Sequence, residues 1–111
     1  MSDAQTIQWP GKSGKTYLYW IYPIGTRMLE QAGNYLFAKE TKPGDWLPVY
    51  IGQAKNLDKR LENHEKEDCA TRNGATHIHA HLNAGGEAVR KAEEKDLILR
   101  WQPVCNEQLV G

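Results

Sequence analysis

An arginine and a glutamate occupy positions where the helical pattern asks for apolar side chains. Arg60 shares the inward face of a helical segment with residues at the i, i+3, i+4, i+7 spacing, which are Leu57, Leu61 and His64. In a second helical segment, Glu94 lies near the centre of the apolar stripe. An inward guanidinium needs an anion and an inward carboxylate needs a cation, because burying an unpaired charge is costly. The pattern therefore indicates anion binding at Arg60 and cation binding at Glu94.

Each of these charges also has a structural explanation. Arg60 could pair with a nearby carboxylate, and Glu94 could pair with Arg90 one helical turn earlier. A metal ion is the alternative cation for Glu94, and Glu93 lies at the edge of the same stripe. The sequence alone leaves both interpretations open.

Two tyrosines lie on segments that we expect to pair as the strands of a hairpin. If Tyr35 and Tyr50 lie on the same face of that hairpin, their hydroxyl groups line a common surface. Packing in the core or at an interface is the alternative role for both rings.

The expected elements give an α+β pattern, without the strand-helix alternation of a parallel sheet. They are a strand over 17–24, strands over 33–40 and 46–52 joined by a turn at 42–45, a helix over 57–68 capped by Asn56, a strand over 75–82 and a helix over 87–101. Apolar residues on both faces of 17–24 predict a strand covered on both sides. Residues 1–16 are polar and predict a flexible tail, so one domain is expected over 17–111.

Composition limits the function classes. The 111 residues carry 14 basic and 14 acidic side chains, which argues against coating nucleic acid by bulk charge but leaves room for a local basic site. The most apolar stretch, 17–24, is far shorter than a membrane-spanning helix, and the first residues lack the pattern of a secretory signal. We therefore expect a cytoplasmic protein with no membrane partner, in which Cys69 and Cys105 are reduced thiols.

Two further patterns imitate binding sites. The segment 11–16 reads GKSGKT, but Trp9 stands where a phosphate-binding loop needs glycine, and a strand is expected to follow in place of a helix. His77, His79 and His81 alternate along the strand 75–82, and the outer two are too far apart to bind one zinc ion. We expect these histidines to line a solvated or DNA-facing surface.

Residues 32–107 resemble the GIY-YIG nuclease domain family. Gly33-Asn34-Tyr35 stands in place of the first family tripeptide, and Tyr50-Ile51-Gly52 matches the second without change. Downstream, the family order continues through a helix arginine, an acidic helix and a Pro-x-x-Asn ending, which here are Arg60, Glu94 with Leu97 and Ile98, and Pro103 with Asn106. Asn34 departs from the usual Ile or Val, and residues 1–31 lie outside the motif as an expected N-terminal strand extension or lid.

The resemblance implies a small antiparallel sheet flanked by helices, and a metal-dependent endonuclease that hydrolyses phosphodiester bonds in DNA. Glu94 would bind a single Mg²⁺ or Mn²⁺, Arg60 would contact the phosphate, and Tyr35 or Tyr50 would orient or deprotonate the attacking water. The auxiliary or substrate-binding positions implied around these four are Gly52, Lys55, His64 and Asn106.

A catalytically inactive module that binds nucleic acid or a repair partner is the alternative function, because such domains can persist after catalysis is lost. RNA is a further alternative substrate. Specificity would come from loops, from a homodimer or accessory DNA-recognition partner, or from a branched or damaged DNA structure.

Overall fold

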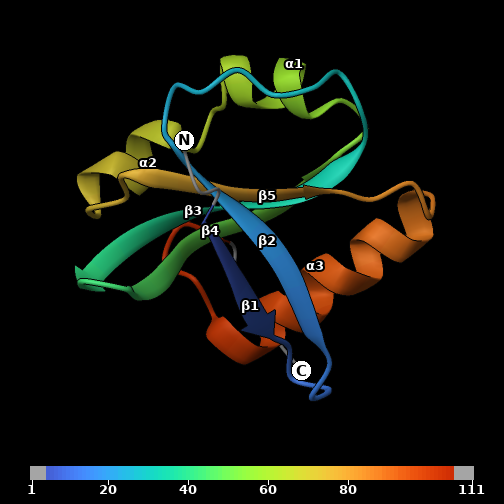
Figure 1. Cartoon of the computed structure of the whole chain (residues 1–111), viewed down its shortest axis with the longest axis horizontal. Coiled ribbons are helices and arrows are strands. Elements are labelled where there is room, and N and C mark those ends of the chain that lie inside the picture. Colours follow the sequence, from blue (N-terminus) through green and yellow to red (C-terminus); the bar gives the residue numbers. More distant parts are fainter. Residues whose placement is uncertain (1–4, 107–111) are drawn as a thin grey trace.

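The computed structural model describes residues 5–106, which form a curled five-stranded antiparallel sheet with three helices (Figure 1). The strands are β1 (Thr6–Pro10), β2 (Thr16–Pro23), β3 (Gly33–Lys42), β4 (Asp45–Ala54) and β5 (His77–Leu82). The helices are α1 (Leu57–Glu62), α2 (Glu67–Arg72) and α3 (Glu87–Trp101). The strand order is β1-β2-β5-β3-β4, with every neighbouring pair antiparallel. The expected α+β class and the hairpin of β3 and β4 are confirmed.

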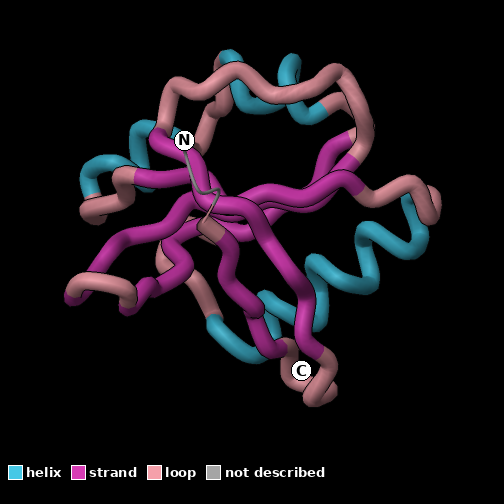
Figure 2. The backbone as a smooth tube through the Cα atoms, in the orientation of Figure 1, coloured by secondary structure: helices cyan, strands magenta, loops and turns pink. Residues whose placement is uncertain are grey.

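The helices cover opposite faces of the sheet, as Figure 2 shows, with α1 and α2 on one side and α3 on the other. Side chains of β3 alternate between these two layers because successive residues of a strand point to opposite faces. Tyr35 and Phe37 pack with α1 and α2, whereas Leu36 and Ala38 pack with α3. The motif tyrosine of β3 therefore belongs to the α1 side of the molecule.

The N-terminal segment is a strand, and the expectation of a flexible tail over 1–16 is wrong for the described residues. β1 pairs with β2 along its whole length, and Trp9 is only 2% exposed. The Trp9 indole donates to Nδ1 of the buried His79 at 3.0 Å. Residues 11–15 form the turn between the two strands, so no helix follows the GKSGKT segment. Residues 1–4 and 107–111 of the expected tail and domain lie outside the described range.

The helix expected over 57–68 is two short helices with a break between them. Asn56 caps α1 as expected, its side chain accepting from the backbone N–H of Lys59 at 3.1 Å. After α1 the chain turns so that His64 is buried, and its Nδ1 accepts from the backbone N–H of Lys66 at 2.9 Å. The inward histidine ring therefore takes up a backbone donor that a continuous helix would have used itself.

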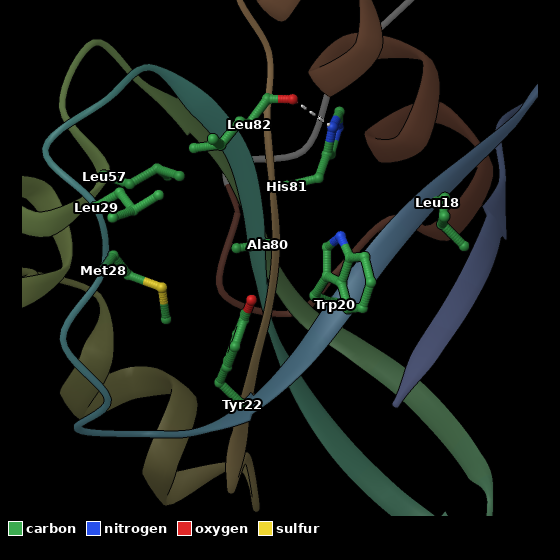
Figure 3. A pocket seen from close by; sticks show the side chains of 9 residues that line it. All are labelled: Leu18, Trp20, Tyr22, Met28, Leu29, Leu57, Ala80, His81 and Leu82. Carbon is green, nitrogen blue, oxygen red and sulfur yellow. Dashed lines mark hydrogen bonds between the residues drawn. The ribbon is translucent and has the colours of Figure 1, made fainter. Parts of the chain in front are cut away.

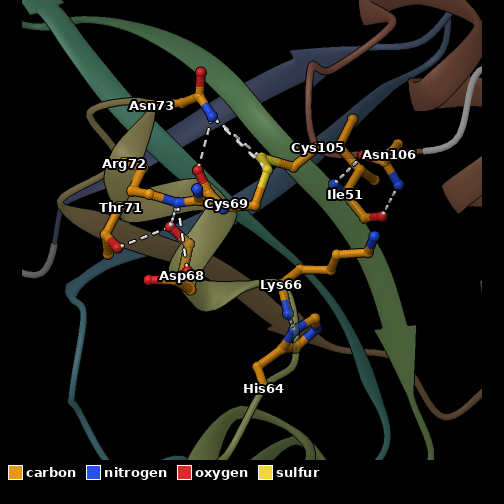
Figure 4. Close-up of a disulfide and its surroundings, with 10 residues drawn as sticks. All are labelled: Ile51, His64, Lys66, Asp68, Cys69, Thr71, Arg72, Asn73, Cys105 and Asn106. Carbon is orange, nitrogen blue, oxygen red and sulfur yellow. Dashed lines mark hydrogen bonds and ion pairs between the residues drawn. A yellow bond between two sulfur atoms is a disulfide. The ribbon is translucent and has the colours of Figure 1, made fainter.

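Cys69 and Cys105 form a disulfide that ties α2 to the segment after α3 (Figure 4). The expectation of reduced thiols is wrong because the fold brings two residues that are 36 apart in the sequence to a Cα–Cα distance of 6.1 Å. Asn73 places its side-chain nitrogen 3.7 Å from both sulfur atoms. The backbone N–H of Cys105 also donates to the carbonyl of Val49 at 3.0 Å, so the disulfide segment lies along the free edge of β4.

β2 is covered on one face only, contrary to the expectation from its two apolar faces. Tyr19 is fully buried toward α3, but Leu18 and Trp20 on the other face are 48% and 40% exposed. They line an open apolar cavity of about 480 Å³, which Figure 3 shows between β2 and the segment that carries Met28 and Leu29. Within residues 5–106 no helix is long and apolar enough to span a membrane.

The three histidines of β5 do not line a solvated surface. His79 is fully buried, and burial lowers its pKa to about 3. His77 packs edge-on against Trp46 at a ring distance of 4.9 Å, and Nε2 of His81 lies 2.7 Å from the carboxylate of Glu93. The histidines therefore serve mainly the packing of the sheet against α3 and the Trp46 side chain.

Candidate active site

The hydroxyl of Tyr35 lies against the ring of His64, with 2.5 Å between the oxygen and Nε2. Burial, followed by the nearby charge of Arg60, lowers the pKa of His64 to about 4, so the ring is neutral at neutral pH. Because Nδ1 accepts from the Lys66 N–H, the single proton of the neutral ring is on Nε2. His64 therefore donates to the Tyr35 oxygen, and the hydroxyl proton of Tyr35 is left for another acceptor.

Tyr50 lies beside Tyr35 on the neighbouring strand. The two tyrosine rings lie 6.2 Å apart on the same face, and each hydroxyl group influences the pKa of the other. Burial raises the pKa of both hydroxyls, that of Tyr35 well above its ordinary value. At Tyr50 the rise is opposed by the charge of Arg60 and by the Tyr35 hydroxyl. Tyr50 is thus the better placed of the two to carry negative charge on its oxygen.

Two glycines allow this close packing. Gly52 pairs with Tyr35 across the hairpin, and a Cβ atom at position 52 would lie 2.5 Å from the Tyr35 hydroxyl oxygen. At Gly33 a Cβ atom would clash with the backbone carbonyl of His81 and with the Leu57 side chain. The glycines of both tripeptides are therefore explained by close approach of neighbouring atoms.

The charges of Arg60 on α1 and Glu94 on α3 influence the pKa values of the two tyrosines. Arg60 on α1 is one-third exposed and makes a 3.2 Å ion pair with Glu65, so the structural explanation for its charge holds in part. Its charge lowers the pKa of both tyrosines. Glu94 on α3 is half-buried, which raises its own pKa, and its charge raises the pKa of both tyrosines. Both charged residues that the sequence singled out thus influence the pKa of the tyrosine pair.

Glu94 has the properties of a carboxylate that could hold a hard cation. Its oxygens make no hydrogen bond or ion pair with any residue that the structure describes. The same described range holds no cluster of three or more potential metal-ligating side chains. Mg²⁺ needs only one or two protein carboxylates, because water and substrate phosphate supply its other ligands. A single ion shared between Glu94 and a phosphate therefore fits the residues present.

The expected pairing of Arg90 with Glu94 does not occur. Arg90 is buried and its Nε donates to the side chain of Gln53 on β4 at 3.0 Å. Asn34 reaches the same region, donating to the backbone carbonyl of Arg90 at 2.9 Å and accepting from Asn83 at 3.0 Å. The polar residue in the first tripeptide is therefore fully buried and satisfied, and it fixes α3 to the sheet.

Glu93 is buried more deeply than its expected position at the edge of the stripe implies. It is 6% exposed, and one of its carboxylate oxygens accepts from the Tyr19 hydroxyl at 2.6 Å and lies 2.7 Å from Nε2 of His81. The sequence placed Glu94 alone at the centre because the partners of Glu93 come from β2 and β5. Glu93 holds α3 against those strands, whereas the charge of Glu94 raises the pKa of both tyrosines.

The two remaining candidate residues are Lys55, which is an exposed cation, and Asn106, which holds the backbone of β4. Lys55 is exposed just after β4. Asn106 accepts from the backbone N–H of Ile51 and donates to the Ile51 carbonyl, both at 2.8 Å (Figure 4). Because β4 is an edge strand, this side chain completes the backbone pairing of the second tripeptide.

Comparison with known proteins gives no significant match to a protein-family model, a curated protein or a solved structure. Membership of the GIY-YIG family therefore stays a prediction from the two tripeptides and the residues that follow them. The geometry of Tyr35, Tyr50, Arg60 and Glu94 is independent of that resemblance.

Proposed function

We propose that this protein is a metal-dependent endonuclease of the GIY-YIG type that hydrolyses phosphodiester bonds in DNA. One observation carries the proposal: a pair of neighbouring tyrosines lies within the electrostatic reach of both a partly exposed arginine and an unpartnered, half-buried carboxylate. These are the groups that phosphodiester hydrolysis needs, since it requires an oriented water, a phosphate contact and a cation ligand.

Arg60 and Glu94 divide the work at the phosphate. Arg60 would donate hydrogen bonds to the phosphate oxygens as negative charge grows on them. Glu94 would hold one Mg²⁺ or Mn²⁺, which when bound supplies Lewis-acid stabilisation of the scissile phosphate and the departing oxygen.

Tyr50 would orient the attacking water, with Tyr35 and His64 as positioning residues. His64 donates to Tyr35, and the ring of Tyr50 packs against both residues, so the Tyr50 side chain is held in place. The charge of Arg60 favours negative charge on that oxygen. In this arrangement His64 is a hydrogen-bond donor to the tyrosine pair, which differs from the role of auxiliary base.

Nicking of supercoiled plasmid DNA in Mg²⁺ or Mn²⁺ tests the proposal. The parent should nick the plasmid, EDTA should abolish nicking, and Arg60→Gln should slow it about 100-fold. Arg72→Gln is the matched control, because Arg72 is an exposed arginine on α2 outside the site, and it should nick like the parent. A parent that binds branched DNA but cleaves neither DNA nor RNA would favour the alternative of an inactive binding module.

A further inference from the structure

Arg90 is the one buried charged side chain among the described residues that makes neither an ion pair nor a hydrogen bond with a charged group. Three acidic or arginine side chains are less than a tenth exposed, namely Asp58 at 5%, Glu93 at 6% and Arg90 at 7%. Asp58 pairs with Arg27, and Glu93 receives hydrogen bonds from Tyr19 and faces His81. Within the described residues, the only side-chain hydrogen bond of the Arg90 guanidinium goes to the neutral amide of Gln53.

Most of the Arg90 guanidinium is free to bind something else. Nε donates to Gln53, and neither Nη group makes a hydrogen bond or ion pair with any residue between 5 and 106. The only fully enclosed side-chain nitrogen or oxygen without a partner in that range is Nε2 of His79, so the Nη groups of Arg90 reach the surface. A desolvated guanidinium with free donors is costly unless it meets an anion, and its paired N–H groups suit phosphate oxygens.

Arg90 adjoins the candidate active site and lies among both basic and acidic side chains. Gln53 directly follows Gly52 of the second tripeptide, and Arg90 lies one helical turn before Glu94. The hydrogen bond from Lys91, followed by the charges of Lys91, Arg90 and Lys55, lowers the pKa of the exposed Glu87, and Lys91 forms a 3.0 Å ion pair with it. Arg90 also lies in the first turn of α3, where the helix dipole adds to the attraction for an anion.

We propose that Arg90 is a second phosphate-binding residue, which contacts a DNA backbone phosphate beside the one held by Arg60. This inference rests on the proposed function, because it takes DNA as the substrate. Gln53 is a positioning residue for this contact, since it orients the guanidinium through Nε and leaves the Nη groups for the phosphate. Asn34 fixes the helix backbone at the same residue.

DNA binding without cleavage tests the inference directly. The probe is a fluorescein-labelled Y-shaped DNA with single-stranded and duplex arms, titrated in EDTA at several KCl concentrations and followed by anisotropy. Arg90→Gln should bind about tenfold more weakly at about 0.1 M KCl, and its slope of log K against log salt should be smaller by about one. Arg90→Lys keeps the charge with fewer donors, and it should keep the slope while losing part of the affinity.

Arg100→Gln is the matched control, because Arg100 is an exposed arginine near the opposite end of the same helix. It should bind like the parent. Equal affinity and equal salt slope for Arg90→Gln and Arg100→Gln would overturn the inference.

A measurement on the parent protein covers the case in which Arg90→Gln does not fold. The Nε–H resonance of Arg90, assigned by its loss in Arg90→Lys, should shift when the Y-shaped DNA is added, and an unchanged resonance would overturn the inference. Failure of the proposed function can be distinguished from failure of this inference. A parent that does not cleave DNA but binds it through Arg90 would contradict the proposed function and leave the inference standing. A cleaving parent whose binding ignores Arg90 would contradict the inference alone.

Discussion

The side chain of Asn106 holds both backbone groups of Ile51, the central residue of the tripeptide that carries Tyr50. Its amide accepts the Ile51 N–H and donates to the Ile51 carbonyl, each at 2.8 Å. An edge strand that carries a candidate catalytic side chain is thereby kept in register by a residue 55 positions later in the chain. The position of Tyr50 relative to Tyr35 therefore depends on a contact from outside the hairpin.

Loss of this clamp should loosen β4 locally. Asn106→Ala removes two hydrogen bonds, so we expect unfolding to become easier by about 1–3 kcal/mol and exchange of the Ile51 amide hydrogen to accelerate. Hydrogen exchange followed by NMR measures this, with Asn63→Ala as the control because Asn63 is exposed. Unchanged exchange at Ile51 in Asn106→Ala would contradict the clamp.

The disulfide should stabilise the protein through the long loop that it closes. For a loop of 36 residues, loss of the crosslink in Cys69→Ser should lower the free energy of unfolding by about 3–4 kcal/mol. Urea unfolding with and without dithiothreitol measures the effect. The parent should lose stability when dithiothreitol reduces the disulfide, whereas Cys69→Ser should be equally stable with and without dithiothreitol. A parent whose stability does not change with dithiothreitol would contradict the crosslink.

Stability should fall on mild acidification because two histidines are buried in their neutral form. Burial lowers the pKa of His64 to about 4 and that of His79 to about 3, below the unfolded value of about 6.5. The unfolded chain therefore takes up protons first, so the free energy of unfolding decreases as pH drops from about 6.5 toward 4, by at most about 1.4 kcal/mol per pH unit for each histidine.

Urea unfolding at pH 7 and pH 5 checks this dependence. His64→Gln should reduce the difference between the two pH values, because the variant loses one of the two titrating groups. A variant at the partly exposed His77 is the control and should keep the full difference. If His64→Gln lost as much stability between pH 7 and pH 5 as the parent does, His64 would not be buried in its neutral form. Its proposed role as a neutral donor to Tyr35 would then be wrong.

The two tyrosines should differ in their effect on DNA cleavage. Tyr50→Phe removes the oxygen proposed to orient the water and should slow cleavage about 100-fold. Tyr35→Phe removes only the group that positions Tyr50, so we expect a loss of about tenfold. Initial rates on plasmid DNA compare the two variants, and a larger loss in Tyr35→Phe would reverse the proposed roles.

Much of the scaffold could be predicted because local signals agree with the final packing. The hairpin follows from two short apolar segments around a Pro-Gly turn, and the start of α1 follows from Asn56, whose side chain caps the helix as expected. The helix over 87–101 has the bounds that its periodicity and the following Pro103 predict. In these segments no distant contact had to override the local preference.

The missed features depend on distant partners. β1 has few apolar residues, and its pairing with β2 and the contact of Trp9 with His79 distinguish that segment from a tail. The break after α1 arises because His64 packs against Tyr35. A local pattern also could not tell that Arg90 would meet Gln53 in preference to Glu94, since both residues are within reach of a long side chain.

The role of Glu94 is the most direct test of the account. We would measure nicking of supercoiled plasmid in Mg²⁺ and in Mn²⁺ by the parent, by Glu94→Gln and by Glu62→Gln, a control at an exposed glutamate of α1. The account predicts that the parent and Glu62→Gln nick the plasmid in a metal-dependent way, whereas Glu94→Gln binds DNA but does not nick it. Metal-dependent nicking by Glu94→Gln at the rate of the parent would contradict the account.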